Sequence, residues 1–252
     1  MPVSIAHIYR YPVKGLSAAP LDRVALTPGQ GLAHDRRFAL AHATARFEGA
    51  THWLPRRNFL MLARNPRLAA LETAFDPESE TLTVARDGKV VARGKMTEPA
   101  GRAVLEDFFA AYTGDEAPDR PRLVEASDQP FSDLPEPFLS IINLASVAAL
   151  ERRVGAPIDP VRFRGNLYID GTEPWTEFTW VGREIEAGVA RFRIVEPIER
   201  CAATNVNPDS GVRDMNLPKA LADDFGHVDM GVYAEVVAGG EVAVGDPVRM
   251  PL

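Results

Sequence analysis

The sequence predicts a β-rich, α+β fold, and three observations support that prediction. Proline is frequent, with 21 of 252 residues, about 8% against roughly 5% in average proteins. Segments with helical periodicity are few and short, whereas β-prone runs bounded by turn residues recur along the chain. Strands and helices do not alternate regularly. Together these features favour a β-barrel-like or α+β architecture over a doubly wound sheet.

The first third of the chain contains mainly predicted strands. Four β-prone runs end at turn residues, at 4–13, 21–29, 36–43 and 67–75. Residues 81–94 form the clearest hairpin, because Asp87-Gly88 joins two β-prone runs and suits a type I′ turn.

The first predicted helix covers residues 97–114. Thr97 is its expected cap, Pro99 suits its first turn and Gly114 ends it. One apolar face repeats at helical spacing and consists of Val104, Leu105, Phe108, Phe109 and Tyr112. The polar, proline-rich segment 115–122 then predicts a boundary.

The second half mixes strands with two short helices. Asn143 and Gly155 bound a predicted helix at 143–155, and a second helix is predicted at 217–226. The predicted strands of this half lie at 162–170, 179–188, 190–198, 231–239 and 242–250.

Composition excludes several classes of function. A net charge of −7 argues against general nucleic-acid binding, which needs a basic face for phosphates. One cysteine excludes an intrachain disulfide. No apolar run is long enough to cross a bilayer, and the first residues lack the pattern of a secretory signal. We therefore expect a cytoplasmic protein that does not bind membranes. Rossmann, P-loop and nucleophile-elbow motifs are absent from the sequence.

The single cysteine, Cys201, lies in the segment "ERCAATNVNPDSG". A lone cysteine is most simply a small buried hydrophobe, and a Cys–His nucleophile would need one of five scattered histidines nearby. These scattered residues do not make a zinc site, which needs about four closely spaced ligands. Arg200 would favour the thiolate. A thiolate could ligate a soft metal if a cofactor brought the remaining ligands.

Several basic residues could bind an anion. Lys14 follows a predicted strand in "YPVKGL", and "HDRRF" supplies Arg36 and Arg37. In a strand, Arg162 and Arg164 of "RFRGN" would point to the same face. Such a pair indicates either a solvated strand edge or an anion site. The aromatic residues of "PWTEFTWVG" are expected in the core or in a pocket wall.

The motifs "YPVKGL", "HDRRF", "INLASVAAL", "RFRGNLYID", "PWTEFTWVG", "RCAATNVNPDSG" and "VGDPV" occur in the order found in MOSC-domain proteins. The chain resembles this family over about residues 3–250, and its nearest architecture is that of the mitochondrial amidoxime-reducing component. The resemblance implies a MOSC N-terminal β-barrel domain at 1–120 and a MOSC β-barrel domain at 121–252.

The resemblance also implies a site for the molybdenum cofactor, the molybdenum-bearing molybdopterin. Cys201 would be the metal ligand and the catalytic residue. The pterin and its phosphate would be held by Lys14, the Gly15 backbone, Arg36, Arg162 or Arg164, and Asn166, with Arg200 nearby and Tyr233 lining the same pocket. Of the two alternatives, Arg164 matches the family arginine better because it lies two residues before Asn166. Animal members have Lys-Ser-Cys where this chain has Lys14-Gly15-Leu16, so position 15 could offer only its backbone.

The function implied is that of an oxidoreductase acting on N-hydroxylated or N-oxide compounds. A single cysteine cannot support an iron–sulfur cluster, so electrons would come from a separate flavin or haem reductase. Two alternatives stay open: a carrier of the cofactor or of sulfur without its own turnover, and a structural barrel with an empty pocket.

Overall fold

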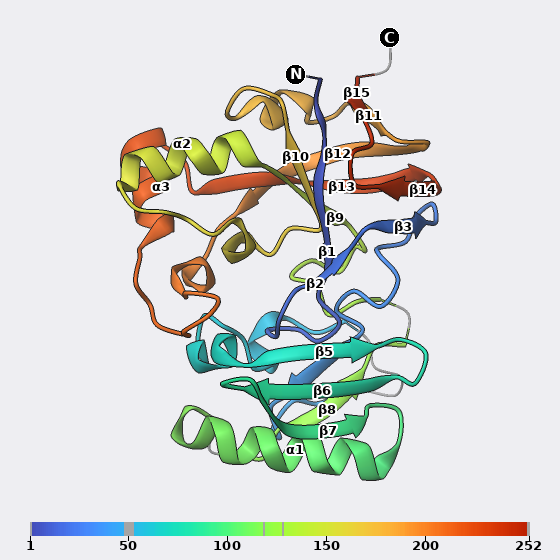
Figure 1. The fold of residues 1–252 in the computed structure, drawn as a ribbon, viewed down its shortest axis with the longest axis vertical. Helices are drawn as coiled ribbons and strands as arrows, with labels where there is room; N and C mark the ends of the chain where they lie inside the picture. The colour runs from blue at the N-terminus through green and yellow to red at the C-terminus, as the bar shows by residue number, and fades with distance from the viewer. Residues whose placement is uncertain (1, 48–52, 118, 128, 251–252) are drawn as a thin grey trace.

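The computed structural model describes residues 2–47, 53–117, 119–127 and 129–250. The β-rich, α+β fold predicted from the sequence is confirmed. Two parts are stacked along the long axis, and both chain ends lie in the upper part (Figure 1). The upper part holds a large curled sheet with helices α2 (Leu144–Val154) and α3 (Leu217–Phe225).

The upper sheet has eight strands in the order β15-β11-β12-β13-β9-β10-β1-β2. Along the chain these strands are β1 (Ser4–Arg10), β2 (Ala19–Leu21), β9 (Leu139–Asn143), β10 (Leu167–Asp170), β11 (Glu184–Ala187), β12 (Ala190–Glu199), β13 (Asp229–Ala238) and β15 (Val248–Arg249). A short additional pair joins β3 (Arg23–Leu26) to β14 (Gly240–Ala243).

Strand β12 shows why the upper sheet forms. Phe192 and Ile194 are fully buried, whereas the alternating Arg191 and Arg193 are exposed. This period of two places one face of β12 in an apolar core and the other in solvent. Side chains from β1, β9, β10 and β13 complete the same core.

Strands β9 and β10 pair in parallel, and α2 lies between them in sequence. A parallel pair requires such a crossover. The predicted caps of α2 are confirmed: the Asn143 side chain accepts the Ala145 N–H, and Gly155 adopts a left-handed φ of 73°. Helix α3 packs against α2.

The lower part contains two small sheets and the longest helix. Its strands are β4 (Phe38–Ala41) paired with β8 (Arg122–Glu125), and β5 (Glu72–Asp76), β6 (Thr81–Arg86) and β7 (Lys89–Lys95) in order. The predicted turn is confirmed, because Asp87 and Gly88 have φ of 51° and 70° between β6 and β7.

Helix α1 (Pro99–Thr113) differs from the predicted helix in its N-cap residue and in the width of its buried apolar face. Its N-cap is Glu98 rather than Thr97, and no side chain caps it. Leu105 and Phe109 are fully buried, but Val104 is 49% exposed. The apolar face is therefore narrower than the sequence predicts.

Among the described residues, six short 3₁₀ helices connect these elements. They are η1 (Arg56–Asn58), η2 (Pro66–Ala70), η3 (Gly114–Glu116), η4 (Pro160–Phe163), η5 (Thr176–Trp180) and η6 (Ala202–Asn205). Three of them (η2, η4 and η5) replace parts of predicted strands. The predicted strand at 67–75 begins as η2, where Pro66 occupies the first turn. The one predicted at 179–188 is shortened to β11 because η5 precedes it.

Strands β1, β2 and β3 belong to the upper part, since β1 pairs with β10 and β2, and β3 pairs with β14. The loop between β1 and β2 instead packs on the lower core through Val13 and Leu16. The division at residues 120/121 stays a prediction. Residue 118, in the predicted boundary segment, lies outside the described residues. Within the described ranges, no helix combines the length and hydropathy needed to cross a membrane.

Candidate functional site

A cavity of about 130 Å³ lies where the two parts of the molecule meet, and every site residue named from the sequence lines it. They are Lys14, Gly15, Arg36, Arg162, Arg164, Asn166, Arg200, Cys201 and Tyr233. These residues come from the loop after β1, the loop before β4, η4 and the turn after it, the end of β12, and β13. The structure therefore brings the predicted set together, and the role of each residue stays a prediction.

Cys201 follows β12 and immediately precedes η6. Its carbonyl accepts hydrogen bonds from the backbone N–H and the hydroxyl of Thr204, at 3.1 and 3.0 Å. The residue is half-buried. It also lines an adjoining cavity of about 430 Å³, which we call the vestibule. The cavity and the vestibule share six lining residues, which are Arg56, Asp133, Glu199, Arg200, Cys201 and Tyr233.

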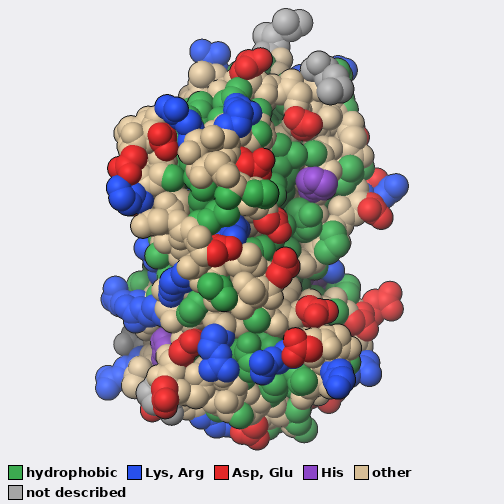
Figure 2. Space-filling view, turned by 60° about the vertical axis from the view of Figure 1, so that its left-hand side comes forward, with side chains coloured by type: hydrophobic (Ala, Val, Ile, Leu, Met, Phe, Trp, Pro, Cys, Tyr) green, Lys and Arg blue, Asp and Glu red, His purple; other side chains and the backbone are tan. Residues whose placement is uncertain are grey.

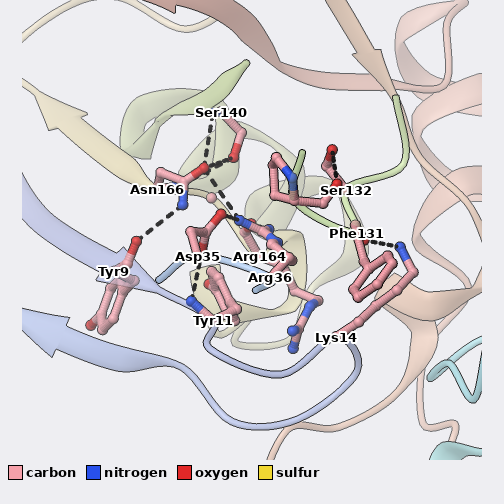
Figure 3. Close-up of polar contacts among 12 residues, drawn as sticks. Tyr9, Tyr11, Lys14, Asp35, Arg36, Phe131, Ser132, Ser140, Arg164 and Asn166 are labelled. Carbon is pink, nitrogen blue, oxygen red and sulfur yellow. Dashed lines mark hydrogen bonds and ion pairs between the residues drawn. The ribbon is translucent and has the colours of Figure 1, made fainter. Parts of the chain in front are cut away.

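Lys14 is buried at the lower side of the cavity. Its Nζ donates to the Phe131 carbonyl at 2.9 Å (Figure 3). The same nitrogen donates to Asp133 Oδ1 at 2.6 Å. Burial lowers the pKa of Lys14, and the Asp133 carboxylate opposes that shift. The next residue, Gly15, has φ of 82°, and a Cβ there would lie 3.3 Å from the Leu60 carbonyl oxygen. The tight turn that directs Lys14 therefore favours glycine.

Arg36 connects the lower loop to the upper sheet. Its guanidinium pairs with Asp35 and donates to Asn166 Oδ1 at 3.3 Å and to the Arg164 carbonyl at 2.9 Å (Figure 3). Burial by itself would lower the pKa of Arg36, but the Asp35 carboxylate raises it. Arg36 thus remains charged. It links its own loop to the segment around Arg164, which lies 128 residues further along the chain.

Arg162 and Arg164 do not lie in a strand, so the prediction that they share a strand face is wrong. Asp159 accepts the Val161 N–H at 2.8 Å and Pro160 begins η4, which ends at Arg164 in a left-handed conformation with φ of 50°. This turn replaces the first half of the predicted strand. Both arginines nevertheless line the cavity.

Arg162 is paired, whereas Arg164 and Arg200 lack carboxylate partners among the described residues. The Arg162 side chain is 3% exposed and contacts Asp214 at 2.8 Å. Arg164 donates to the Leu16 carbonyl, and Arg200 donates to the carbonyls of Phe163 and Met230. Burial lowers the pKa of Arg164 to about 10 and lowers that of Arg200. The cavity therefore carries positive charge that its own carboxylates do not neutralise.

Two donors at this cavity are buried and lack hydrogen-bond partners in the described structure, Arg162 Nε and Arg164 Nη2. Unpaired buried donors are uncommon because each carries a desolvation cost. Their position in the lining is suited to an anion that accepts hydrogen bonds. Both arginines also line a neighbouring groove of about 560 Å³.

Asn166 and Tyr233 complete the predicted set. The Asn166 amide oxygen accepts from the backbone N–H and hydroxyl of Ser140 at 3.1 and 3.0 Å, and its amide nitrogen donates to the Tyr9 carbonyl at 3.2 Å. Asn166 is therefore tied into the scaffold. Burial raises the pKa of Tyr233, whose ring lies 6.3 Å from that of Phe138.

Sequence reasoning missed several lining residues, including Arg56, Asp133 and Glu199. A buried lysine needs a carboxylate, so the partner of Lys14 could have been expected in general. Only the tertiary fold places Asp133 there, 119 residues away along the chain. The aromatic residues of "PWTEFTWVG" pack into core clusters, with Trp180 7% exposed, and do not line the cavity.

Figure 2 shows basic and acidic side chains interspersed over the face that it presents. Charge of one sign does not gather on that face.

Comparison with known families now places the chain. The profile of the MOSC domain matches residues 128–249, and that of the MOSC N-terminal beta barrel domain matches residues 3–121. The chain belongs to the MOSC-domain family. This membership confirms the resemblance inferred from the motifs around Lys14, Arg164 and Cys201.

Curated relatives of this MOSC-domain protein match at low identity. Mitochondrial amidoxime-reducing component 1 of Mus musculus is 22% identical over 98% of this chain and 82% of its own length. Molybdenum cofactor sulfurase of Caenorhabditis briggsae is 25% identical over 87% of this chain. Mitochondrial amidoxime-reducing component 1 of Homo sapiens is 29% identical over 45% of this chain. The matches span 31% of the sulfurase and 36% of the human protein, about a third of each.

Solved structures show more distant similarity. The YUAD protein from Bacillus subtilis aligns with 98% of this chain and 94% of its own, at 12% identity and a TM-score of 0.46. YiiM from Geobacillus stearothermophilus aligns with 45% of this chain and 54% of its own, at 23% identity and a TM-score of 0.36.

Proposed function

We propose that this MOSC-domain protein is a molybdenum-cofactor oxidoreductase that reduces N-hydroxylated or N-oxide compounds. One observation carries the proposal: a single thiol lies at a cavity that is lined by six cationic side chains and two carboxylates. Two of those cations, Arg162 and Arg164, hold donors without hydrogen-bond partners in the described structure. The names of the relatives, amidoxime-reducing component and molybdenum cofactor sulfurase, support the same chemistry.

The residues present fit such a cofactor. A thiolate is a suitable ligand for a soft metal, and Cys201 offers one at the cavity. The cofactor's phosphate needs charge-assisted donors, and Arg164 Nη2 and Arg162 Nε are free to donate among the described contacts. We assign Cys201 as the metal ligand and Lys14, Arg36, Arg162, Arg164 and Arg200 as the cationic wall. Gly15 would offer its backbone, and Asn166 would orient Arg36.

The bound cofactor would supply a two-electron reduction of the substrate's N–O bond, with two protons taken up and the oxygen released as water. The protein would hold the cofactor and keep one side of the thiol open. Cys201 and Tyr233 line the vestibule as well as the cavity, so the substrate would approach from the vestibule. The electrons would come from a separate flavin or haem reductase, and we expect both proteins in the cytoplasm.

A carrier function is the second candidate, and the half-exposed thiol favours it. A protein that delivers the cofactor, or a persulfide on Cys201, would need the same accessible sulfur beside an open vestibule. Such a carrier would bind its cargo without turnover.

Reduction of a simple amidoxime separates the candidates. Protein from a host that makes the cofactor is assayed with benzamidoxime and a reduced viologen dye as the electron donor. We expect turnover in the native protein and its loss in Cys201→Ser. Ala202→Ser is the matched control, because it adds a hydroxyl at the exposed neighbouring residue and keeps the thiol. Full activity in Cys201→Ser would refute the assignment, and cofactor binding without turnover would favour the carrier.

A further inference from the structure

Two of the cavity's arginines share one aromatic ring that the sequence did not indicate as part of the site. The guanidinium carbons of Arg36 and Arg164 lie over the ring of Tyr11, at 4.5 and 4.2 Å from its centroid. Tyr11 is fully buried and is absent from the cavity lining. Its ring therefore contacts the two cations from behind the cavity (Figure 3).

The backbone of Tyr11 holds the same segment. Its N–H donates to Asp35 Oδ1 at 2.7 Å, and its carbonyl accepts the Arg36 N–H at 2.7 Å. Asp35 in turn pairs with the Arg36 guanidinium. These contacts enforce a left-handed backbone at Arg36, with φ of 47°, which a non-glycine residue adopts at a cost.

The two cations need such support because they carry like charge in a buried place. Arg36 has Asp35 as a partner, but Arg164 has no carboxylate among the described residues. An aromatic face attracts cations, most strongly where water is excluded. The Tyr11 ring therefore offsets part of the repulsion and fixes where both guanidinium groups lie before any anion arrives.

We propose that Tyr11 is a positioning residue that presents Arg36 and Arg164 to a phosphate group in the cavity. The proposal rests on the proposed function only in identifying that phosphate as part of the molybdenum cofactor. Anion binding by the cofactor-free protein can be measured independently.

The test is a titration of inorganic phosphate into full-length protein from a host that cannot make the cofactor, at constant ionic strength. Tyr11→Phe keeps the ring and should bind phosphate within about twofold of the native protein. Tyr11→Leu removes the ring and should bind about tenfold more weakly. Phe192→Leu removes a fully buried ring from the upper core and should leave the phosphate affinity unchanged.

Fluorinated phenylalanines at position 11 keep the test decisive if Tyr11→Leu does not fold. Each added fluorine weakens the negative face of the ring while nearly preserving its size. Phosphate affinity should therefore fall stepwise from phenylalanine to trifluorophenylalanine, which a purely structural role would not produce. A constant affinity across this series, or no phosphate binding by the native protein, would overturn the proposal.

If the proposed function is wrong but the role of Tyr11 is right, molybdenum analysis and phosphate titration give a distinct pair of results. Native protein from a cofactor-making host would then lack molybdenum, while the cofactor-free protein would still show the graded loss of phosphate affinity. That combination would retain the positioning role and reject the cofactor. Molybdenum in the native protein with a flat fluorination series would reject only the role of Tyr11.

Discussion

The substitution Arg164→Met should weaken anion binding at the cavity while leaving the free energy of unfolding nearly unchanged. Arg164 is a half-buried cation with one hydrogen bond to the Leu16 carbonyl and one buried, unpartnered nitrogen. The lowering of its pKa from 12.5 to about 10 corresponds to about 3 kcal/mol against the charged form. Neutral pH lies below both values, so this cost is fully present there and would be relieved only as the pH rises above about 10 toward 12.5.

Methionine removes that cost and keeps similar apolar bulk. The substitution also loses the bond to Leu16 and the contact with Tyr11, together worth about 2 to 3 kcal/mol. The free energy of unfolding of the cofactor-free protein should therefore change by no more than about 1 kcal/mol. Phosphate, by contrast, should no longer protect the variant against unfolding as it protects the native protein.

Urea denaturation at pH 7, followed by tryptophan fluorescence, provides the assay. Arg37→Met is the matched control, because Arg37 pairs with Glu80 and Glu125, both at 2.6 Å, at 26% exposure. Losing these two ion pairs should cost about 1 to 2 kcal/mol, and Glu125 keeps its pair with Arg102 at 3.0 Å. If Arg164→Met cost more than about 3 kcal/mol, or kept phosphate protection, the view of Arg164 as an uncompensated cation held for an anion would be refuted.

Two further substitutions test the scaffold around the site. Glu177 is fully buried, and burial raises the pKa of its carboxyl, opposed by hydrogen bonds from Asn143 and Ser146. A pKa that is higher in the folded than in the unfolded protein means that the folded protein binds the proton more tightly. The free energy of unfolding should therefore fall as the pH rises from 4.5 through the raised pKa of Glu177. Glu177→Gln should flatten that slope in urea titrations at several pH values, and an unchanged slope would count against the assignment. Gly101→Ala should destabilise the lower part by about 2 to 3 kcal/mol, because a Cβ would lie 2.2 Å from the Lys95 carbonyl oxygen. A calorimetric melting temperature equal to that of the native protein would show that the contact between α1 and β7 relaxes freely.

Much of the fold could be predicted because local signals agreed with tertiary structure. The Asp87-Gly88 turn needs two left-handed residues, and this dipeptide supplies them. The helix from Asn143 to Gly155 carries its own start and stop residues. The predicted strands that were wrong or too long lie where a local turn competes with a β-prone run. Arg162 entered η4 because Asp159 and Pro160 begin a turn just before it.

The lining of the cavity could be predicted from motifs, and the network behind it could not. Lys14, Arg164 and Cys201 lie in short motifs that a reader of sequences can recognise. Asp133 lies outside these motifs and acts through a partner that the fold brings close. Tyr11 is the first residue of "YPVKGL", but its contacts with Arg36 and Arg164 depend on the fold. The tertiary structure decides which side chains are buried against each other and which charges are paired, so sequence spacing alone does not reveal these contacts.

Metal analysis of the purified protein tests the central claim most directly. Protein from a cofactor-making host should contain about one molybdenum atom per chain, and Cys201→Ser from the same host should contain far less. Equal molybdenum in the two proteins would contradict the role of Cys201 as the ligand. A molybdenum content no higher than background in the native protein would contradict the proposed cofactor itself.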